Sequence, residues 1–423
     1  MNRIQRSAVT VLAAGALFLN TALPAFATTL EISGNGDSEN KIEFDQNNTT
    51  GVEQSNKADI DNKINVVAST GNNEANRNTG GSVSIKTGDA ESNVDVKTNA
   101  NSNSAEVSGC GACGAGADVL ISGNGDGSKN TVNLDVNESE KNNEDATPVY
   151  VSQSNDADIY NEVSAAALTG KNEANRNTGG DVIIETGDAT VGVDVTNAVN
   201  GNAARVGGDE NEAGSLSARI VGNGSDTHNK IELDVNRSVF VDQSNDADVD
   251  NNIDVAAKTG KNEAERNTGG SVSIETGNAE VTVGVDNMVN FNWAEVDCCR
   301  LGDDLVKIAG NGDESKNTID ADLLGGFWVD QDNRATSGEV DNGIDGVAKT
   351  GGNEIERSTG VVDPADPSIE TGDAMIDVTV ENDVNMNAQG AELDFDVPEG
   401  PHFNLNLSFD FGDLMDWLLS HQA

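Results

Sequence analysis

Apolar residues alternate with polar or small residues along most of the chain. Val191, Val193 and Val195 are separated by single small or polar residues, and residues 231–235 and 281–285 repeat the pattern. A period of two with β-branched residues indicates strands that bury one face. Segments such as T-G-D and N-T-G-G separate these runs, and their glycine and asparagine residues supply the positive φ angles of tight turns. The pattern therefore predicts an all-β chain.

Helical spacing of apolar residues is found near the C-terminus, at residues 411–419, behind an acidic start. Just before it, residues 403–409 alternate as a strand does. We expect residues 395–423 to end in a short helix and to cap the last layer of strands, dock another subunit or contact a membrane surface. The acidic residues around the segment disfavour contact with an anionic membrane.

The chain is built from four copies of a long repeat. A Gly-Asn-Gly turn starts each copy at residues 34, 123, 222 and 310. The motifs V-x-Q-[SD]-N-x-A, T-G-x-N-E, N-T-G-G and T-G-D-A follow in the same order with small variations. The predicted divisions are repeat unit 1 at 28–109, a Gly/Cys linker at 110–117, and units 2, 3 and 4 at 118–208, 209–299 and 300–394.

A shorter period lies inside the long one. Gln54, Gly71 and Gly88 follow one another at intervals of 17 residues, and units 2 and 3 keep the same spacing. A coil of 17 to 20 residues has the size of one β-solenoid rung, and rungs stack about 4.8 Å apart. We therefore predict a solenoid of about 20 such rungs, a rod about 100 Å long. The alternative is a row of tandem β-sandwich domains, one to each unit.

The N-terminus has the features of a secretory signal peptide. A basic segment at residues 2–6 precedes an apolar stretch at 8–19, and Ala25, Phe26 and Ala27 fit the cleavage rule. We predict a signal peptide at 1–27 and a secreted protein that is extracellular or on the cell surface of a prokaryote. After cleavage, no stretch approaches the roughly 20 apolar residues that span a bilayer.

Composition narrows the function. Aromatic residues make up only 4% of the chain, so small residues must do the packing. A formal net charge of -48 argues against nucleic acid as a partner. The three histidines have no metal-ligand spacing and no hydrolase or nucleotide-binding motif occurs, so we expect no enzyme. Trp293 and Trp328 are isolated in the sequence and are interpreted as core or seam residues.

One acidic row is a candidate calcium site. Asp246, Asp248 and Asp250 place three carboxylates on one strand face, and oxygen ligands suit Ca²⁺. The row has neither an EF-hand glycine nor tandem G-G-x-G-x-D repeats, and a solvated acidic face is the alternative interpretation.

All four cysteines lie at the seams between units. Cys110 and Cys113 follow unit 1, and Cys298 and Cys299 end unit 3. In a stack of short rungs these pairs would lie roughly 50 Å apart, far beyond the reach of a disulfide. A local bond between Cys110 and Cys113, links between neighbouring molecules, and a zinc site made by both pairs stay open.

The V-x-Q-[SD]-N-x-A motif resembles the curlin repeats of secreted bacterial surface fibres, in which glutamine and asparagine side chains stack in ladders. The residues that carry the resemblance are Gln54, Asn56, Gln153, Asn155, Gln243, Asn245, Gln331 and Asn333. The resemblance implies a secreted structural or adhesive component of the cell surface or extracellular matrix. We expect it to associate with itself or with other matrix components, and a fibre would form by end-to-end stacking. The alternative is a calcium-stabilised extracellular protein whose repeats bind a ligand.

Overall fold

The computed structural model describes nine stretches of the chain. They are residues 8–14, 28–46, 49–107, 117–137, 149–207, 216–297, 304–335, 340–359 and 367–390. The helix expected at residues 411–419 lies outside them, as does the whole of 395–423. Every element of the described residues is a β-strand, and none of these residues belongs to a helix that could cross a membrane.

Each long repeat folds into one layer, which we call a rung. Rung 1 contains β2 (Thr28–Ser33), β3 (Glu39–Gln46), β4 (Thr50–Gly71), β5 (Val83–Lys86) and β6 (Ala90–Val107). Rung 2 contains β7 (Ala117–Ser122), β8 (Lys129–Val136), β9 (Val149–Gly170), β10 (Val182–Thr186) and β11 (Ala189–Gly207). Rung 3 contains β12 (Leu216–Val221), β13 (His228–Lys258), β14 (Glu263–Glu265), β15 (Val272–Thr276) and β16 (Ala279–Asp297). Rung 4 contains β17 (Leu305–Ala309), β18 (Lys316–Arg334), β19 (Val340–Lys349), β20 (Glu354–Glu356), β21 (Ser368–Thr371) and β22 (Ala374–Gln389).

Strands pair in parallel between rungs, which confirms the prediction of an all-β solenoid. In the sheet that contains β9, Gln153 lies between Gln54 of β4 and Gln243 of β13. Equivalent residues are therefore 99 and 90 positions apart in sequence. Tandem sandwiches would pair their strands inside each unit, so the observed pairing rules out that alternative.

The predicted rung of 17 to 20 residues is wrong. Gln54 and Gly71, the first two members of the 17-residue echo, lie in the same 22-residue strand β4. The echo therefore runs along one strand and does not climb from layer to layer. Ser, Asn and Asp in the motif around Gln54 indicate turns in many sequences, but here Ser55 and Asp59 point outwards, Asn56 points inwards, and the strand continues.

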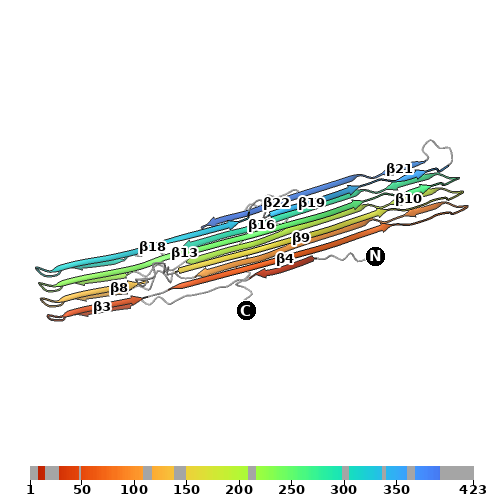
Figure 1. Cartoon of the computed structure of the whole chain (residues 1–423). Helices are drawn as coiled ribbons and strands as arrows, with labels where there is room; N and C mark the ends of the chain where they lie inside the picture. The colour runs from red at the N-terminus through yellow and green to blue at the C-terminus, as the bar shows by residue number, and fades with distance from the viewer. Residues whose placement is uncertain are drawn as a thin grey trace.

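The long axis of the molecule follows the strands. β13 alone has 31 residues, which at strand rise is about 100 Å. The four rungs stack to a height of only about 20 Å, and Figure 1 shows the resulting flat slab. The expected rod of about 20 stacked rungs is therefore replaced by a slab of four, in which the length is set by the strands.

A rung runs along both broad faces of the slab. After β2 the chain turns at Gly-Asn-Gly and runs along β3 and β4 to the far tip, and then returns along β5 and β6. The sheets on the two broad faces pack against each other through their inward side chains. β2 contacts β3, and the two ends of β6 contact the two ends of β4, through their inward side chains.

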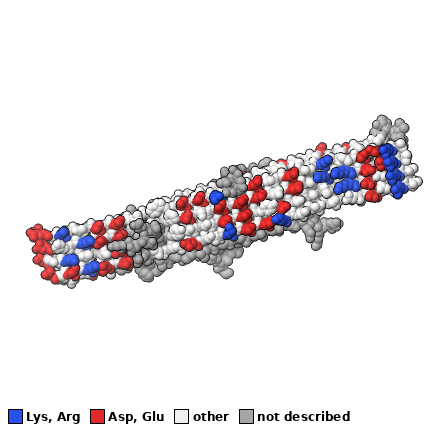
Figure 2. Space-filling view, viewed as in Figure 1, with Lys and Arg blue, Asp and Glu red and all other residues white. Residues whose placement is uncertain are grey.

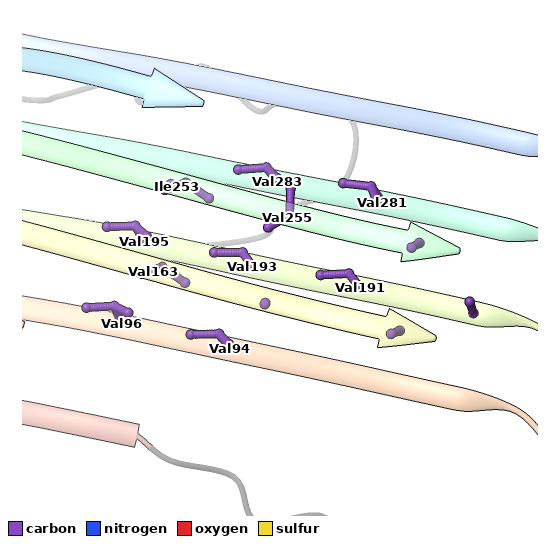
Figure 3. Packing of buried hydrophobic residues seen from close by; sticks show 14 of the residues in the cluster. Val94, Val96, Val163, Val191, Val193, Val195, Ile253, Val255, Val281 and Val283 are labelled. Carbon is purple, nitrogen blue, oxygen red and sulfur yellow. The ribbon is translucent and has the colours of Figure 1, made fainter. Parts of the chain in front are cut away.

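The interior alternates between apolar clusters and belts of amides. The inward side chains along β9 illustrate the order. They are Val149, Val151, Gln153, Asn155, Ala157, Ile159, Asn161, Val163, Ala165 and Ala167. Figure 3 shows one apolar cluster, in which valines of facing strands stack rung over rung. Because equal residues stack in columns, small side chains fill the narrow space without aromatic residues.

A glycine stands where the long strand of each rung gives way to the tip segment. Gly170 ends β9 with a φ of 106°, and a Cβ at this position would overlap the carbonyl oxygen of Gly260 in the next rung. The T-G-x-N-E motif is therefore required both by the backbone angle and by the closeness of the layers.

A further strand, β1 (Ala8–Ala14), pairs in parallel with β6 on the outer side of rung 1. It lies within the segment predicted to be a signal peptide. Cleavage before Thr28 would remove β1 and leave β6 as an open edge.

Candidate functional site

The four glutamines of the repeated motif form one continuous ladder. Nε2 of Gln153 donates to Oε1 of Gln54 at 2.8 Å, and Gln243 and Gln331 continue the series, each at 2.8 Å. Their second donor positions bond backbone carbonyls of the facing sheet, for example Gln153 to Ala203 at 2.9 Å. The ladder therefore joins all four rungs and also fastens one face of the slab to the other.

The four asparagines of the motif form a second ladder beside the first. Nδ2 of Asn56 donates to Asn155 at 3.1 Å, Asn155 to Asn245 at 2.9 Å, and Asn245 to Asn333 at 2.8 Å. Asn155 also donates to Asn202 of the facing sheet at 2.8 Å, so the ladders are cross-linked. Burying an amide costs little free energy only when its donors and acceptor form hydrogen bonds, and the amides of this belt do so.

The two ladders have opposite directions. Glutamine amides donate towards rung 1, whereas asparagine amides donate towards rung 4. At the outer side of rung 4 the glutamine ladder therefore ends on an acceptor, Oε1 of Gln331. At the outer side of rung 1 it ends on a donor, Nε2 of Gln54, and the asparagine ladder ends there on an acceptor, Oδ1 of Asn56.

Sequence analysis missed a second amide belt nearer the tip. Asn62, Asn161, Asn251 and Asn342 form a ladder on one sheet, and Asn197, Asn287 and Asn382 form a ladder on the other. The sequence signal for this belt is an asparagine that occupies, in every unit, one inward position of a strand whose other nearby inward residues are apolar. Without the rung length, that signal does not show which asparagines stack.

The outer edge of rung 4 is apolar. Among the described residues, every exposed large hydrophobic side chain except Val67 belongs to this rung. Val378 is 43% exposed, whereas its partner Val283 in rung 3 is 1% exposed. The side chains of rung 4 point into the same columns as those below, but no described layer covers them. The backbone groups of β17, β18, β19, β21 and β22 form the matching open sheet edges.

Charges on the broad faces also form columns. Figure 2 shows acidic and basic side chains gathered across the layers, with acidic groups in the majority. Some columns contain both signs: Lys86 of rung 1 contacts Glu185 of rung 2 at 2.7 Å, and two further acids, Glu275 and Glu370, continue this column. Such surface pairs contribute little to stability, but they help to define which residues stack.

The calcium candidates lie side by side on the outer face of β13. Asp246 and Asp248 are exposed and Asp250 is half-buried. Asp246 lies 3.7 Å from Arg334, and burial together with the charge of Asp341 raises the pKa of Asp250. Within the described stretches, no group of three or more acidic, histidine or cysteine side chains is close enough to hold a metal ion. A strand spaces alternate side chains too widely to make one site of this row.

The four candidate cysteines, Cys110, Cys113, Cys298 and Cys299, lie outside the described residues. The residues that flank them correct the expected distance between the seams. Val107 and Val296 belong to one column and are two layers apart, which is roughly 10 Å. The expected separation of roughly 50 Å is wrong because it assumed short rungs.

Sequence analysis also missed a buried ion pair at the seam between rungs 3 and 4. The side chain of Arg237 is 1% exposed, and its Nη1 lies 2.9 Å from Oδ2 of Asp304. Oδ1 of Asp304 accepts the backbone N–H of Leu216 at 2.9 Å. Removing either charge would leave the other buried without this ion pair, so the pair holds the start of rung 4 against rung 3.

Comparison of the chain with protein-family models, with curated proteins and with solved structures found no match.

Proposed function

We propose that the mature protein is a secreted structural component that polymerises by stacking rung 4 of one copy against rung 1 of the next. The observation that carries this proposal is the apolar edge of rung 4, which repeats the inward columns of the rungs below it. Unpaired strand edges with apolar side chains are templates for further strands. A contact between two different ends does not close on itself, so it generates a filament.

The ends of the two amide ladders support the same pairing. If a second copy continued the stack, Gln54 of that copy would donate to Gln331, and Asn333 would donate to Asn56. Both bonds repeat the direction found between rungs inside one molecule. A copy placed in the reverse orientation would bring acceptor to acceptor in the glutamine ladder.

Charge also favours this orientation at several columns. Continuing the columns would place Lys86 over Glu370, Lys97 over Glu381, Glu31 over Lys307 and Glu39 over Lys316. Other columns would bring acids together, such as Asp61 over Asp341. Because those acids repel at neutral pH, polymerisation should be faster at raised salt or mildly acidic pH.

Electron microscopy and fibre diffraction of residues 28–423 test the proposal. We expect ribbons that are wider than the roughly 100 Å of β13, whose strands lie across the filament axis, with a meridional reflection near 4.8 Å. A protein that stays monomeric in analytical ultracentrifugation at high concentration, raised salt and pH 5 would contradict it.

A charge exchange tests the predicted contact between copies. Glu370→Lys alone and Lys86→Glu alone should each slow polymerisation, because each brings like charges together at the junction. The double variant should recover part of the lost rate, since the exchanged charges again attract across it. Equal slowing by all three variants would rule out this orientation of the stack.

A further inference from the structure

Three aromatic residues that are far apart in sequence form one column on the outer face of the slab. Tyr150 of β9 pairs with Phe240 of β13, which pairs with Trp328 of β18. The rings of Tyr150 and Phe240 are stacked, with centroids 5.6 Å apart and planes 5° from parallel. The interpretation of Trp328 as a core or seam residue is wrong, because this side chain is 54% exposed.

The indole of Trp328 reaches back along its own strand towards Gly326. A Cβ placed on Gly326, two residues earlier on the same face, would be 3.7 Å from Cη2 and 3.9 Å from Cζ3 of the indole. The far edge of the indole therefore lies above a residue that has no side chain, and more than half of Trp328 stays exposed.

Polar groups lie along one side of the aromatic column. The neighbouring column of outward-pointing residues contains Ser152, Asp242 and Asp330, which follow the three aromatic residues by two positions. The column after that contains Ser154, Ser244 and Asp332. Carboxylates accept hydrogen bonds, and serine hydroxyls both donate and accept them.

We propose that this face binds a flat, uncharged, β-linked polysaccharide whose sugar rings pack on the aromatic column. Sugars of this class combine apolar ring faces with hydroxyl groups at the ring edges, which matches aromatic rings beside carboxylates and serines. An exposed aromatic surface is unusual in a chain that has so few aromatic residues.

Charge selects among the possible occupants of this face. Asp242, Asp330 and Asp332 beside the rings repel anionic polymers, and the net charge of -48 adds to that repulsion. The same carboxylates would repel the equivalent face of a second copy. A neutral polymer meets neither penalty, and its hydroxyl groups can donate to the carboxylates.

Isothermal titration calorimetry of the unpolymerised mature protein with three hexasaccharides tests the proposal. The probes are cellohexaose, which is neutral, an oligoguluronate, which is anionic, and a glucosamine hexamer, which is cationic. We expect heat of binding with cellohexaose and none with the oligoguluronate. Binding of the glucosamine hexamer alone would show simple charge attraction to the carboxylates and would overturn the proposal, as would no binding of cellohexaose.

Adjacent residues of β18 provide a matched pair of variants. Trp328→Ala should lower the association constant for cellohexaose roughly tenfold, which corresponds to about 1.4 kcal/mol for the lost aromatic contact. Phe327→Ala should leave it unchanged, because Phe327 pairs with the buried Val239 and points into the interior columns.

The same two variants separate this proposal from polymerisation. Phe327→Ala removes apolar surface from an interior column at the open edge of rung 4 and should slow polymerisation strongly, whereas Trp328→Ala changes the outer face of that edge and should slow it much less. Loss of cellohexaose binding in both variants, or in neither, would show that the aromatic column is not the binding surface.

Discussion

Amide side chains perform two tasks in the interior of this protein. The asparagine at each inward position bonds its equivalents above and below, which fixes the vertical alignment of the rungs. It also bonds an amide of the opposite sheet, which fixes how one face lies on the other. A valine at such a position would pack equally well in several alignments, whereas an unpaired buried amide is costly. The amide belts thus select a single arrangement of layers.

Asn245 is the best position at which to test this role. Its Nδ2 contacts Asn292, Asn333 and the carbonyl of Phe291, and its Oδ1 accepts from Asn155. Asn245→Ala should lower the free energy of unfolding by about 2 kcal/mol, because several buried groups lose a partner. Urea unfolding followed by far-UV circular dichroism measures the change. The control is Ser244→Ala on the outer face of the same strand, and an equal loss in both variants would argue against the ladder as the cause.

The charged side chains of a strand point to the outer face, where some acids lie beside acids of the neighbouring rung. Burial, and then the charges of Glu381 and Asp383, raise the pKa of Asp286 in β16 above its ordinary value of 3.8. Burial, and then Asp330 and Asp332, raise the pKa of Asp242 in β13 in the same way. Two acids have the opposite shift: hydrogen bonds from Lys129 and Arg219 lower the pKa of Glu39 and of Asp118.

These shifts predict an unusual dependence of stability on pH. An acid with a raised pKa destabilises the folded state when it is ionised, fully so above its folded pKa, and this cost disappears as the pH falls towards the unfolded value of 3.8. The stabilisation from Glu39 and Asp118 is lost only when the pH falls below their ordinary values of 4.5 and 3.8. The melting temperature should therefore rise as the pH falls through the folded pKa values of Asp242 and Asp286, until the loss at Glu39 begins below 4.5.

Asp286→Asn separates this effect from a general response to acid. The variant should melt at a higher temperature than the wild type at pH 7 and show a smaller rise on acidification. Asp118→Asn should have the opposite sign at pH 7, because it removes a carboxylate that lies 2.7 Å from Arg219. Parallel pH profiles for the wild type and Asp286→Asn in differential scanning calorimetry would contradict the assignment.

The whole molecule is a stack of few, very long layers. Its length is therefore independent of the number of repeats, whereas its height depends on that number alone. Every repeat contributes one complete circuit of both faces, so an outer rung has the same side-chain pattern as an inner one but lacks a neighbour. The apolar edge of rung 4 follows directly from this architecture.

Deleting one repeat tests the direction of the stack. Removing residues 209–299 takes away rung 3 and joins rung 2 to rung 4, whose columns match. Small-angle X-ray scattering of the monomer should show an unchanged maximum dimension, which is set by the strands and exceeds the roughly 100 Å of β13 alone, and a thinner cross-section. A maximum dimension that shortens by about a quarter would instead indicate short rungs stacked along the length of the molecule.

The alternation of residues, the fourfold repeat and the repeated glutamines and asparagines are visible in the sequence, and they determine an all-β solenoid with amide ladders. They do so because a strand needs only a local period of two, and a ladder needs only equal residues at equal places. Rung length could not be predicted in this way, since the 17-residue echo and the 90-residue repeat both satisfy the same local pattern.

Only the pairing of strands across 88 to 99 residues decided which repeat forms the layer. That choice set the direction of the long axis, the roughly 10 Å between the seams, and the column in which Tyr150, Phe240 and Trp328 meet. These features depend on contacts between distant parts of the chain, whose energies are collective and leave no local trace in the sequence.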